Sequence, residues 1–503
     1  MKKSRTQKAI VNFFTSVFYE ITSLLVGLIV PRLILTNFGS AYNGITHSIS
    51  QFISYIALMR AGIGGVTRAA LYKPLSERNN EEISSVIMST QKFMRKIAVI
   101  FVGFVLLFAC IYPFIVTEFD WFFTASLIVV ISISTFAEYY FGFTYQMLLM
   151  ADQKSYVSIL MTCGVTVLNG FVSIVLINSG FGIHIVKLAN ALVSCLLPLF
   201  LNIYVKKKYN INKNAIPSEE KIAQRWDAFA HEIASFIRNN SDIVILTLFS
   251  NMYDVSVYTV YHYVTANIKK IVEMCTSSFD AAFGNMHAKN ELELMNENLS
   301  IFELIVFSLV GIINSVALVM IVPFIMIYTK GVNDADYSRP LFSIVLILVS
   351  VFDNYRIPYK TIVTSCGHYK QTRNGAVVEC LLNVVISSIC VIKFGLIGVV
   401  IGSLCAVIFR TLQFVVYLSK NILNRSISYF IKHLFINSII MIAVYLISSP
   451  FVRHNLSIFD WIIDSCITTL IASSLTLITD YLFYKKDMNN LFKKIFKKDL
   501  FKC

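Results

Sequence analysis

Long apolar runs recur through the whole chain, and they constrain its fold more than any other feature. Two of them read IAVIFVGFVLLFACIYPFIV at 97–116 and LFSIVLILVSVF at 341–352. A helix of about 20 apolar residues crosses the roughly 30 Å hydrocarbon core of a bilayer. Only 14% of the 503 residues are charged, against about 25% in a soluble protein. The sequence therefore predicts an all-α polytopic membrane protein.

These runs predict fourteen transmembrane helices. Spans 1–6 form an N-lobe (1–205) and spans 7–12 a C-lobe (228–419), joined by a polar cytoplasmic linker (206–227). Spans 13 and 14 occupy 420–484, and a basic cytoplasmic tail follows at 485–503. The predicted spans are 12–35, 44–67, 97–116, 121–149, 156–178, 183–205, 228–250, 254–283, 300–329, 341–365, 374–392, 396–419, 430–449 and 459–484.

The basic residues predict the orientation of these spans. With both termini in the cytoplasm, 30 of the 43 Lys and Arg fall on the cytoplasmic side, five on the outer side and eight within spans. Cytoplasmic loops carry such an excess of Lys and Arg. We therefore expect a multi-pass protein of the bacterial cytoplasmic (inner) membrane. Its net charge of +14 indicates contact with anionic membrane lipids and no nucleic acid. The loop 68–96 is typical of an amphipathic surface helix.

The cysteines give no sign of a metal or redox centre. The ten Cys are scattered singly, mostly inside apolar runs, with no CxxC and no Cys/His cluster. Such residues usually act as small hydrophobic groups in helix packing. We predict no metal site, no catalytic residues and no cofactor, apart from a coupling H⁺ or Na⁺. No cleavable signal peptide is recognised at the N-terminus.

Three pairs of motifs predict that the two lobes are copies of one unit. FYEITS (18–23) matches AHEIAS (230–235), which places Glu20 over Glu232 at an offset of 212. SGFGIHIV (179–186) matches IKFGLIGV (392–399) at 213, and ADQK (151–154) lies over GHYK (367–370) at 216. Because six spans is an even number, both copies enter the membrane from the same side. The lobes are thus expected to be parallel, as in transporters that rock around a central cavity.

Charged residues within the spans point to a hydrated interior. A charge facing lipid at mid-bilayer costs about 2.5–3.5 kcal/mol, so most of them must face inward. Arg60 and Lys270 fall at comparable depths of spans 2 and 8, and Arg238 and Lys269 lie nearby. Arg binds phosphate through paired hydrogen bonds and Lys as a point charge. Two of these residues also have a purely structural explanation. Lys269 could form an ion pair with Glu273 one turn away, and Glu232 could stabilise the dipole at the start of its helix.

Three blocks of sequence resemble one transporter family. They are PRLILTNFGSAYNGITHSISQFISYIALMRAGIGGVTRAALYKPL (31–75), NNSDIVILTLFSNMYDVSVYTVYHYV (239–264) and KQTRNGAVVECLLNVVISSICVIKFGLIGVVIGSLCAVIFRT (370–411). The chain resembles bacterial polysaccharide repeat-unit flippases, the Wzx-like members of the multidrug/oligosaccharidyl-lipid/polysaccharide exporter superfamily. The resemblance implies two six-helix lobes plus two further helices.

The resemblance also implies an activity and a set of residues. The expected activity is transfer of an undecaprenyl-diphosphate-linked oligosaccharide from the inner to the outer leaflet, for capsule, O-antigen or exopolysaccharide synthesis. Polysaccharide polymerase and glycosyltransferases are the implied partners. Arg60 stands where related lipid II flippases carry Arg in span 2. The remaining matches are Asp242 in an N-S-x-D-like block, and Glu379, Asn383 and Arg410 in a late E…N…R block.

The mechanism expected from these residues is alternating access. The diphosphate docks on Arg60, Arg238, Lys269 and Lys270, while Glu20, Glu232 and Asp242 are candidates for H⁺ or Na⁺ coupling, because burial raises the pKa of a carboxyl group. Two alternatives stay open. One is a multidrug or cation antiporter of the same superfamily, which the cations within the spans disfavour. The other is an integral-membrane polysaccharide polymerase, which the short external loops disfavour.

Overall fold

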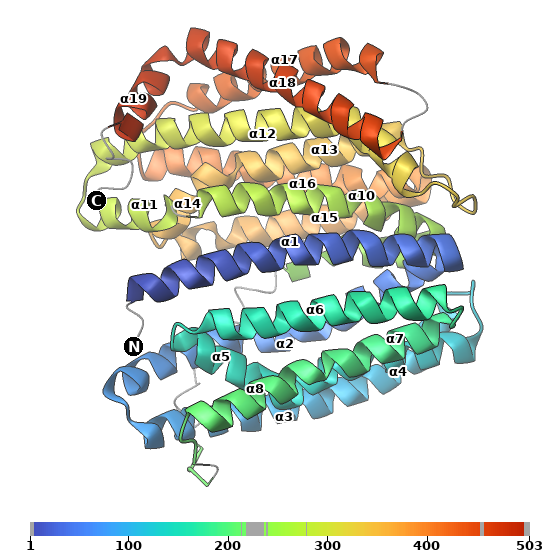
Figure 1. Ribbon diagram of the computed structural model, residues 1–503. Helices are drawn as coiled ribbons and strands as arrows, with labels where there is room; N and C mark the ends of the chain where they lie inside the picture. Colours follow the sequence, from blue (N-terminus) through green and yellow to red (C-terminus); the bar gives the residue numbers. More distant parts are fainter. Residues whose placement is uncertain are drawn as a thin grey trace. The chain divides into compact units, whose positions relative to one another are not determined.

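The computed structural model describes residues 5–212, 214–217, 236–237, 240–277, 279–452 and 457–496. Within these ranges the chain forms helices and turns, with no strand (Figure 1). The predicted linker 206–227 and the start of span 7 lie largely outside the described residues.

The helices follow the apolar runs of the sequence. Most are single α-helices, and three are interrupted close to their middle, α4/α5 by the π-helix η2, α7/α8 at Cys195 and α13/α14 by a turn at Arg356. The elements that position the sites are α1 (Arg5–Phe38), α2 (Ser40–Glu77), α3 (Asn80–Ile111), α4 (Trp121–Ala137), η2 (Glu138–Gly142), α5 (Phe143–Ala151), α6 (Ser155–Asn178), α7 (Ile183–Ser194), α8 (Leu196–Lys208), α10 (Met252–Thr276), α11 (Phe279–Ala288), α12 (Leu292–Tyr328), α13 (Pro340–Tyr355), α14 (Ile357–Ser365), α15 (Tyr369–Phe394), α16 (Leu396–Asn421), α17 (Ser428–Ser448), α18 (Ile458–Phe483) and α19 (Lys485–Phe496).

Eleven helices of the described chain are long and apolar enough to cross a membrane, so this is a multi-pass membrane protein. Helix α2 contains the predicted span 44–67, and α10 ends at Thr276, seven residues before the end of the predicted span 254–283; neither helix is among the eleven. Of the predicted span 228–250, the short apolar helix Asn240–Phe249 is described. The count of fourteen spans and the arrangement of the lobes stay predictions.

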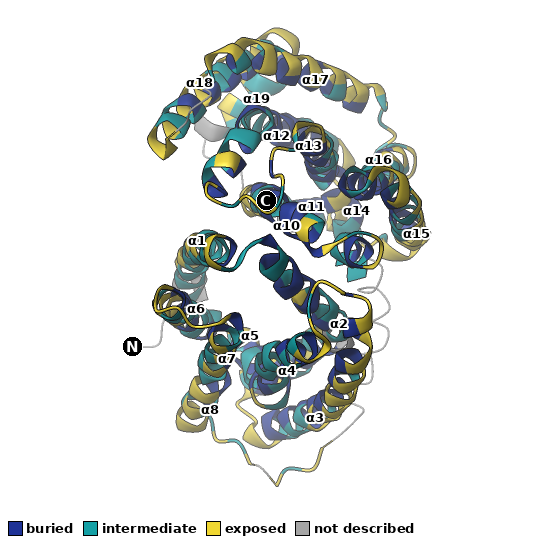
Figure 2. Cartoon of the chain, turned by 90° about the vertical axis from the view of Figure 1, so that its right-hand side faces the viewer, coloured by how far each residue is buried: buried dark blue, intermediate teal, exposed yellow. Residues whose placement is uncertain are grey.

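Exposed apolar side chains form stripes along the outer helices, as expected for surfaces in contact with lipid. On α15, Leu381, Val385 and Ile389 are each more than half exposed and are spaced four residues apart. Such spacing places side chains on one face of a helix. Figure 2 shows the same pattern of exposed positions along one side of α17 and α18. Apolar groups this exposed are stable in hydrocarbon and costly in water.

The chain divides into two compact units, Met1–Ser256 and Val257–Cys503. In unit 1, buried aliphatic residues of α1, α6 and α7, among them Ile34 and Val186, form one hydrophobic cluster. A second cluster joins α2, α3, α5 and α8. In unit 2, α17 and α18 pack on α12 through Leu304, Ile440 and Ala472.

A block of four helices in unit 1 recurs in unit 2 in the same order. Helix α5 (Phe143–Ala151) and helix α14 (Ile357–Ser365) are offset by 214 residues at both ends. The turns that follow them also match. Gln153 and Gly367 both adopt a left-handed conformation, with φ of 57° and 75°. The next residue donates to the carbonyl oxygen five positions earlier in each case, Lys154 to Leu149 and His368 to Val363.

The prediction of a separate surface helix within 68–96 is wrong. Helix α2 extends to Glu77, and a single helix, α3, runs from Asn80 to Ile111 through the predicted membrane boundary. Asn79 starts α3 by accepting a hydrogen bond from the Glu82 amide through its side chain, which is a typical N-cap. No proline interrupts the helix afterwards, so it continues without a break.

Candidate functional site

The site in unit 2 begins with the break between α13 and α14. Pro358 lies at the start of α14 and has no N–H to donate to the carbonyl of Asn354, so the α-helical ladder cannot continue through it. The carbonyl of Phe352, just before the break, accepts a hydrogen bond from the Thr411 hydroxyl of α16 at 3.0 Å. The break therefore places Arg356 at the bend, and the Thr411 contact anchors the end of α13 to α16.

Close packing of α15 on α16 sets the second wall of the site. A Cβ added at Gly402 would lie 2.1 Å from the Ser387 hydroxyl and 2.4 Å from its amide nitrogen, so only glycine allows this approach. Small residues spaced by four let membrane helices pack this closely, and Gly398 lies four residues earlier. The two helices are further joined by Asn383, whose amide donates to Ser403 at 2.8 Å.

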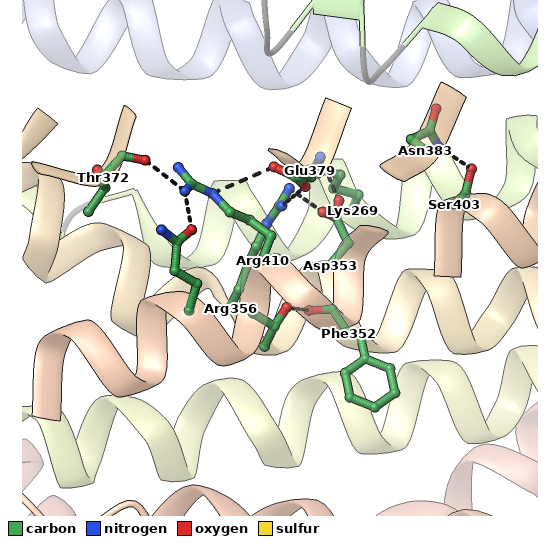
Figure 3. Close-up of polar contacts among 11 residues, drawn as sticks. Lys269, Phe352, Asp353, Arg356, Thr372, Glu379, Asn383, Ser403 and Arg410 are labelled. Atoms are coloured by element: carbon green, nitrogen blue, oxygen red, sulfur yellow. Dashed lines mark hydrogen bonds and ion pairs between the residues drawn. The ribbon is translucent and has the colours of Figure 1, made fainter. Parts of the chain in front are cut away.

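Five charged side chains from four helices form a continuous series of ion pairs in unit 2 (Figure 3). Lys269 of α10 pairs with Asp353 of α13, Nζ to Oδ2 2.7 Å. Asp353 also pairs with Arg356. Arg356 donates to Glu379 of α15 at 2.8 Å, and Arg410 of α16 lies 3.6 Å from the other oxygen of Glu379. We call these five residues the ion network.

Backbone and amide groups complete the coordination of Arg410. Its guanidinium donates to the carbonyl of Thr372 at 2.9 Å and to the side-chain oxygen of Gln413 at 2.5 Å. Gln413 has room because Gly375 opposite it has no side chain. A buried guanidinium is stable only when its donors are satisfied in this way.

The ion network is buried at one end and reaches the surface at the other. The side chains of Arg356, Glu379 and Arg410 are 5–8% exposed, and that of Lys269 is 29% exposed. Three cations face two carboxylates within the network. Glu273, one turn after Lys269 and exposed, is close enough to Arg356 to contribute a third negative charge. Lys269 is therefore the member from which an anionic ligand could displace a carboxylate.

A second buried ion pair lies among α12, α14 and the loop before α17. Arg425 donates to Glu303 at 2.5 Å, and the Tyr359 hydroxyl donates to the other oxygen of Glu303 at 2.6 Å. The guanidinium also covers the ring of Tyr429, 4.2 Å from its centroid. All groups of this pair are satisfied from within the protein, so it joins the helices and offers no binding surface.

In unit 1, side-chain hydrogen bonds join α2 to the segment 240–256. Gln51 of α2 donates to Asn240 at 2.7 Å, Ser48 shares a 2.6 Å hydrogen bond with Thr247, and Asn43 donates to Ser256 at 2.9 Å. These contacts form a polar seam between α2 and the segment 240–256.

The structure brings some of the predicted residues together and leaves others apart. Glu379, Arg410 and Lys269 meet in the ion network, and Asn383 lies on α15 one turn from Glu379. Lys270 follows Lys269 on α10 and is exposed. Glu20 (α1) and Asp242 (helix Asn240–Phe249) are half-buried in unit 1. Arg238 and Glu232 lie outside the described residues, as does the side chain of Arg60 on α2.

Sequence reasoning missed the centre of the ion network and one repeated motif. Arg356 and Asp353 are not among the predicted site residues, and the structural alternative for Lys269 is a pair with Glu273, whereas in the structure its ion pair is with Asp353. The repeated motif is LNGFVS (168–173) and LNVVIS (382–387), also 214 residues apart. In both copies the Asn side chain donates to a serine of the next helix, Asn169 to Ser194 at 3.0 Å and Asn383 to Ser403.

Fold comparison finds solved structures of membrane transport proteins that share this helical fold. The structure is similar to "Lipid II flippase MurJ, inward closed conformation", with a TM-score of 0.74 and 16% identity, over 93% of this chain and 99% of that one. No protein-family model matches the sequence, and a search of curated proteins found no significant match.

Two further solved structures share the fold. One is an inward-facing multidrug resistance MATE family transporter of the MOP superfamily, with a TM-score of 0.61 and 15% identity over 79% of this chain and 94% of that one. The other is a MOP superfamily transporter from Pyrococcus furiosus, described as having a binding pocket of reverse polarity. It has a TM-score of 0.55 and 14% identity over 83% of this chain and 95% of that one. The likeness in each case is one of fold.

Proposed function

We propose that the chain is a flippase that moves undecaprenyl-diphosphate-linked oligosaccharide repeat units across the bacterial cytoplasmic membrane by alternating access. One observation carries this proposal, the extent of the likeness in fold. The match to the lipid II flippase covers 93% of this chain, whereas the MATE family transporter and the Pyrococcus furiosus transporter above cover 79% and 83%. Coverage of 93% leaves too few residues unmatched to omit both α17 and α18, so at least part of this helix pair lies within the matched region.

In the proposed mechanism, the diphosphate is held by Arg60, Arg238, Lys269 and Lys270. The geometry of Lys269 supports this role, because it is both partly exposed and oriented by a carboxylate. An arriving diphosphate replaces Asp353 as the counterion of Lys269, and Asp353 keeps Arg356 as its partner. The exchange leaves no buried charge uncompensated, which matters because an unpaired buried charge costs several kcal/mol.

Repeated export of the cargo requires a driving force. Protonation or Na⁺ binding at Glu20, Glu232 or Asp242 would supply one. The membrane potential supplies another, because a dianion moving outward from a negative interior gains about 2.3 kcal/mol per charge per 100 mV. Polysaccharide polymerase and glycosyltransferases are the proposed partners in the pathway.

The decisive experiment removes the gene and follows the lipid-linked sugars. Loss of the flippase should leave undecaprenyl-diphosphate-linked oligosaccharide accumulating in the inner leaflet, measured by mass spectrometry of extracted lipids. Complementation by the Arg60→Ala/Lys270→Ala double variant should fail although the protein is present at normal levels. Lys420→Ala, an exposed lysine of α16, is the matched control and should restore export. Full export by the double variant would refute the site assignment.

The competing proposal, a cation antiporter, predicts a different result. Such a protein needs a carboxylate that is available to a cationic substrate. In the ion network, both buried carboxylates already face cations. Extrusion of cationic dyes by the wild-type protein, with unchanged lipid-linked intermediates in the deletion strain, would favour the antiporter instead.

A further inference from the structure

A basic cleft lies in unit 1, apart from the ion network and from the polar seam of α2. Its volume is about 900 Å³. One face of α3, the π-helix η2 and the segment 214–217 line it, and three cations of α3 are among its lining residues: Lys92, Arg95 and Lys96. We call it the α3 cleft.

The wall formed by α3 is a single stripe of the helix. Met88, Lys92, Arg95, Lys96 and Val99 are spaced by three or four residues, apart from the adjacent pair at 95 and 96. Residues at this spacing share one face of an α-helix. The stripe therefore presents its cations together, along roughly 6 Å of helix axis at 1.5 Å per residue.

The opposite wall is held in place by hydrogen bonds to the start of α3. The Ser85 hydroxyl donates to the carbonyl of Ile216 at 2.8 Å, and the Asn212 amide donates to the Ser84 hydroxyl at 3.0 Å. Within the segment, the Asn214 amide donates to the side chain of Asn212 at 2.9 Å. The residues 214–217 are thus fixed over α3 by specific contacts, so the cleft is part of the fold.

The charges of the cleft are strongly one-sided. Lys92, Arg95 and Lys96 are exposed, and none of them has a carboxylate within ion-pair distance among the described residues. Arg95 instead lies over the ring of Tyr140, 5.1 Å from its centroid, a contact that orients the guanidinium without neutralising it. The lining residues that the structure describes include these three cations and no carboxylate. This excess of positive charge favours an anion.

The cleft continues into an apolar surface. Val99 and Ile100 also line it and are 67% and 50% exposed. They lie within the candidate membrane span Asn80–Phe114, and the exposed Val102 and Leu106 follow them on α3. An anion-binding end followed by a lipid-exposed apolar face matches an amphiphile with a charged head and hydrocarbon chains.

We propose that the α3 cleft binds the phosphate headgroup of an anionic phospholipid of the surrounding bilayer. Lys92, Arg95 and Lys96 hold the phosphate, and the acyl chains lie along Val99 and Ile100. A soluble phosphate compound could use the same cations, but it would gain nothing from the apolar surface. The proposal concerns a resident lipid and does not depend on which cargo the protein carries.

The test measures lipid retained by the full chain in neutral detergent. The purified protein is delipidated, titrated with phosphatidylglycerol and analysed by native mass spectrometry. The Lys92→Gln/Lys96→Gln variant should bind this lipid on the order of thirtyfold more weakly, because each lysine near an anionic headgroup contributes about a factor of five. Lys206→Gln/Lys207→Gln, at the exposed end of α8, removes the same charge outside the cleft and should bind as the wild type does.

Two further measurements distinguish binding of the phospholipid from binding of a soluble phosphate compound. Glycerol phosphate at millimolar concentration should not displace phosphatidylglycerol. A tryptophan reporter, Val99→Trp, should be quenched by phosphatidylglycerol with brominated acyl chains more strongly than by brominated phosphatidylcholine. The thermal midpoints of all variants should stay close to that of the wild type.

Three results would overturn the proposal. Equal loss of binding in both double variants would mean that general surface charge holds the lipid. Displacement by glycerol phosphate would assign the cleft to a soluble anion. Equal quenching of the reporter by both brominated lipids would show that the apolar face selects no headgroup. None of these outcomes bears on export of lipid-linked sugars, so the proposal and the proposed function are tested separately.

Discussion

Helices α4–α7 of unit 1 and α13–α16 of unit 2 have the same order of structural elements, but they differ in the side chains at the helix break. Both blocks have a broken helix, a left-handed turn and an Asn-to-Ser contact, at an offset of 214. At the break, unit 2 carries Asp353 and Arg356. The positions 214 residues earlier are Tyr139 and Gly142.

The difference extends to the neighbouring helix. Glu379 is the eleventh residue of α15, and the eleventh residue of α6 is Val165; both are buried. Tyr139 is 1% exposed and packs on Phe101, with ring centroids 5.6 Å apart. Unit 1 therefore builds the same helical block without an ion network, which means that the fold does not require the charges. We infer that unit 2 keeps them for a function, since an apolar replacement of a buried ion pair is often neutral or stabilising.

The largest effect is expected when the centre of the network is removed. Arg356→Met leaves Asp353 and Glu379 buried, with only Lys269 and Arg410 beside them. Breaking one side of a buried ion pair costs about 3–5 kcal/mol, so the thermal unfolding midpoint in detergent should fall by several degrees. The corresponding position in unit 1, Gly142, serves as control. Gly142→Ala brings a Cβ within 3.1 Å of Pro198, and should cost clearly less. Equal losses would mean that the network contributes nothing beyond packing.

A nearly equal effect is expected when a charge is introduced into the apolar block. Val165→Glu buries a carboxylate at the position of Glu379, where unit 1 has no Arg356 to pair with it. The group must either stay charged and unpaired or take up a proton, and the cost is about 3 kcal/mol in either case. The unfolding midpoint should fall, and fall less below pH 5, where the carboxyl group is protonated. A variant as stable as the wild type at pH 8 would show that the two positions are not equivalent.

The helices themselves could be predicted because hydrophobicity alone decides them. The predicted spans 374–392 and 396–419 lie inside α15 and α16, with ends within five residues. Helix α3 shows that hydropathy alone does not predict where a helix begins. Hydropathy indicates where a helix enters the bilayer, but Asn79 and the absence of a breaker decide where it begins, so the helix extends seventeen residues before the predicted span 97–116.

The ion network could be predicted only in part, because its members come from four helices far apart in the sequence. Composition showed that charges such as Lys269 and Glu379 must face inward. It could not show that Lys269 meets Asp353 across two helices when Glu273 lies one turn away. The break at Pro358 was visible in the sequence and could have singled out Arg356, because a helix interruption inside a span is tolerated only where neighbours satisfy it.

A smaller effect should follow when both halves of one pair are changed together. Arg356→Met with Glu379→Val makes unit 2 uncharged at two positions that are also uncharged in unit 1, Gly142 and Val165. The double variant should be less destabilised than the sum of the single variants, with a coupling of about 1–3 kcal/mol. Unfolding midpoints of the four proteins complete the cycle. If the effects simply add, the two side chains do not stabilise each other, and the comparison of the units loses its basis. Export should be reduced even where stability recovers, because Asp353, the partner of Lys269, then loses its ion pair with Arg356.

The smallest effect is expected at the charged cluster of unit 1. Asp152 pairs with Lys154 at 2.6 Å and with Lys8 at 3.8 Å, and it accepts a hydrogen bond from the Tyr209 hydroxyl at 2.6 Å. Its side chain is 25% exposed, so water and salt weaken these pairs. Asp152→Asn should cost about 1 kcal/mol at low ionic strength.

Salt distinguishes this cluster from the ion network. At 1 M salt the screening length is about 3 Å, and the loss caused by Asp152→Asn should nearly vanish. The loss caused by Arg356→Met should persist, because its partners are buried beyond the reach of salt. Unfolding midpoints of both variants measured from 0.05 to 1 M salt therefore rank the two sites by burial. A salt-sensitive Arg356→Met would place water inside the network, and the buried carboxylates would then no longer need their cations for stability.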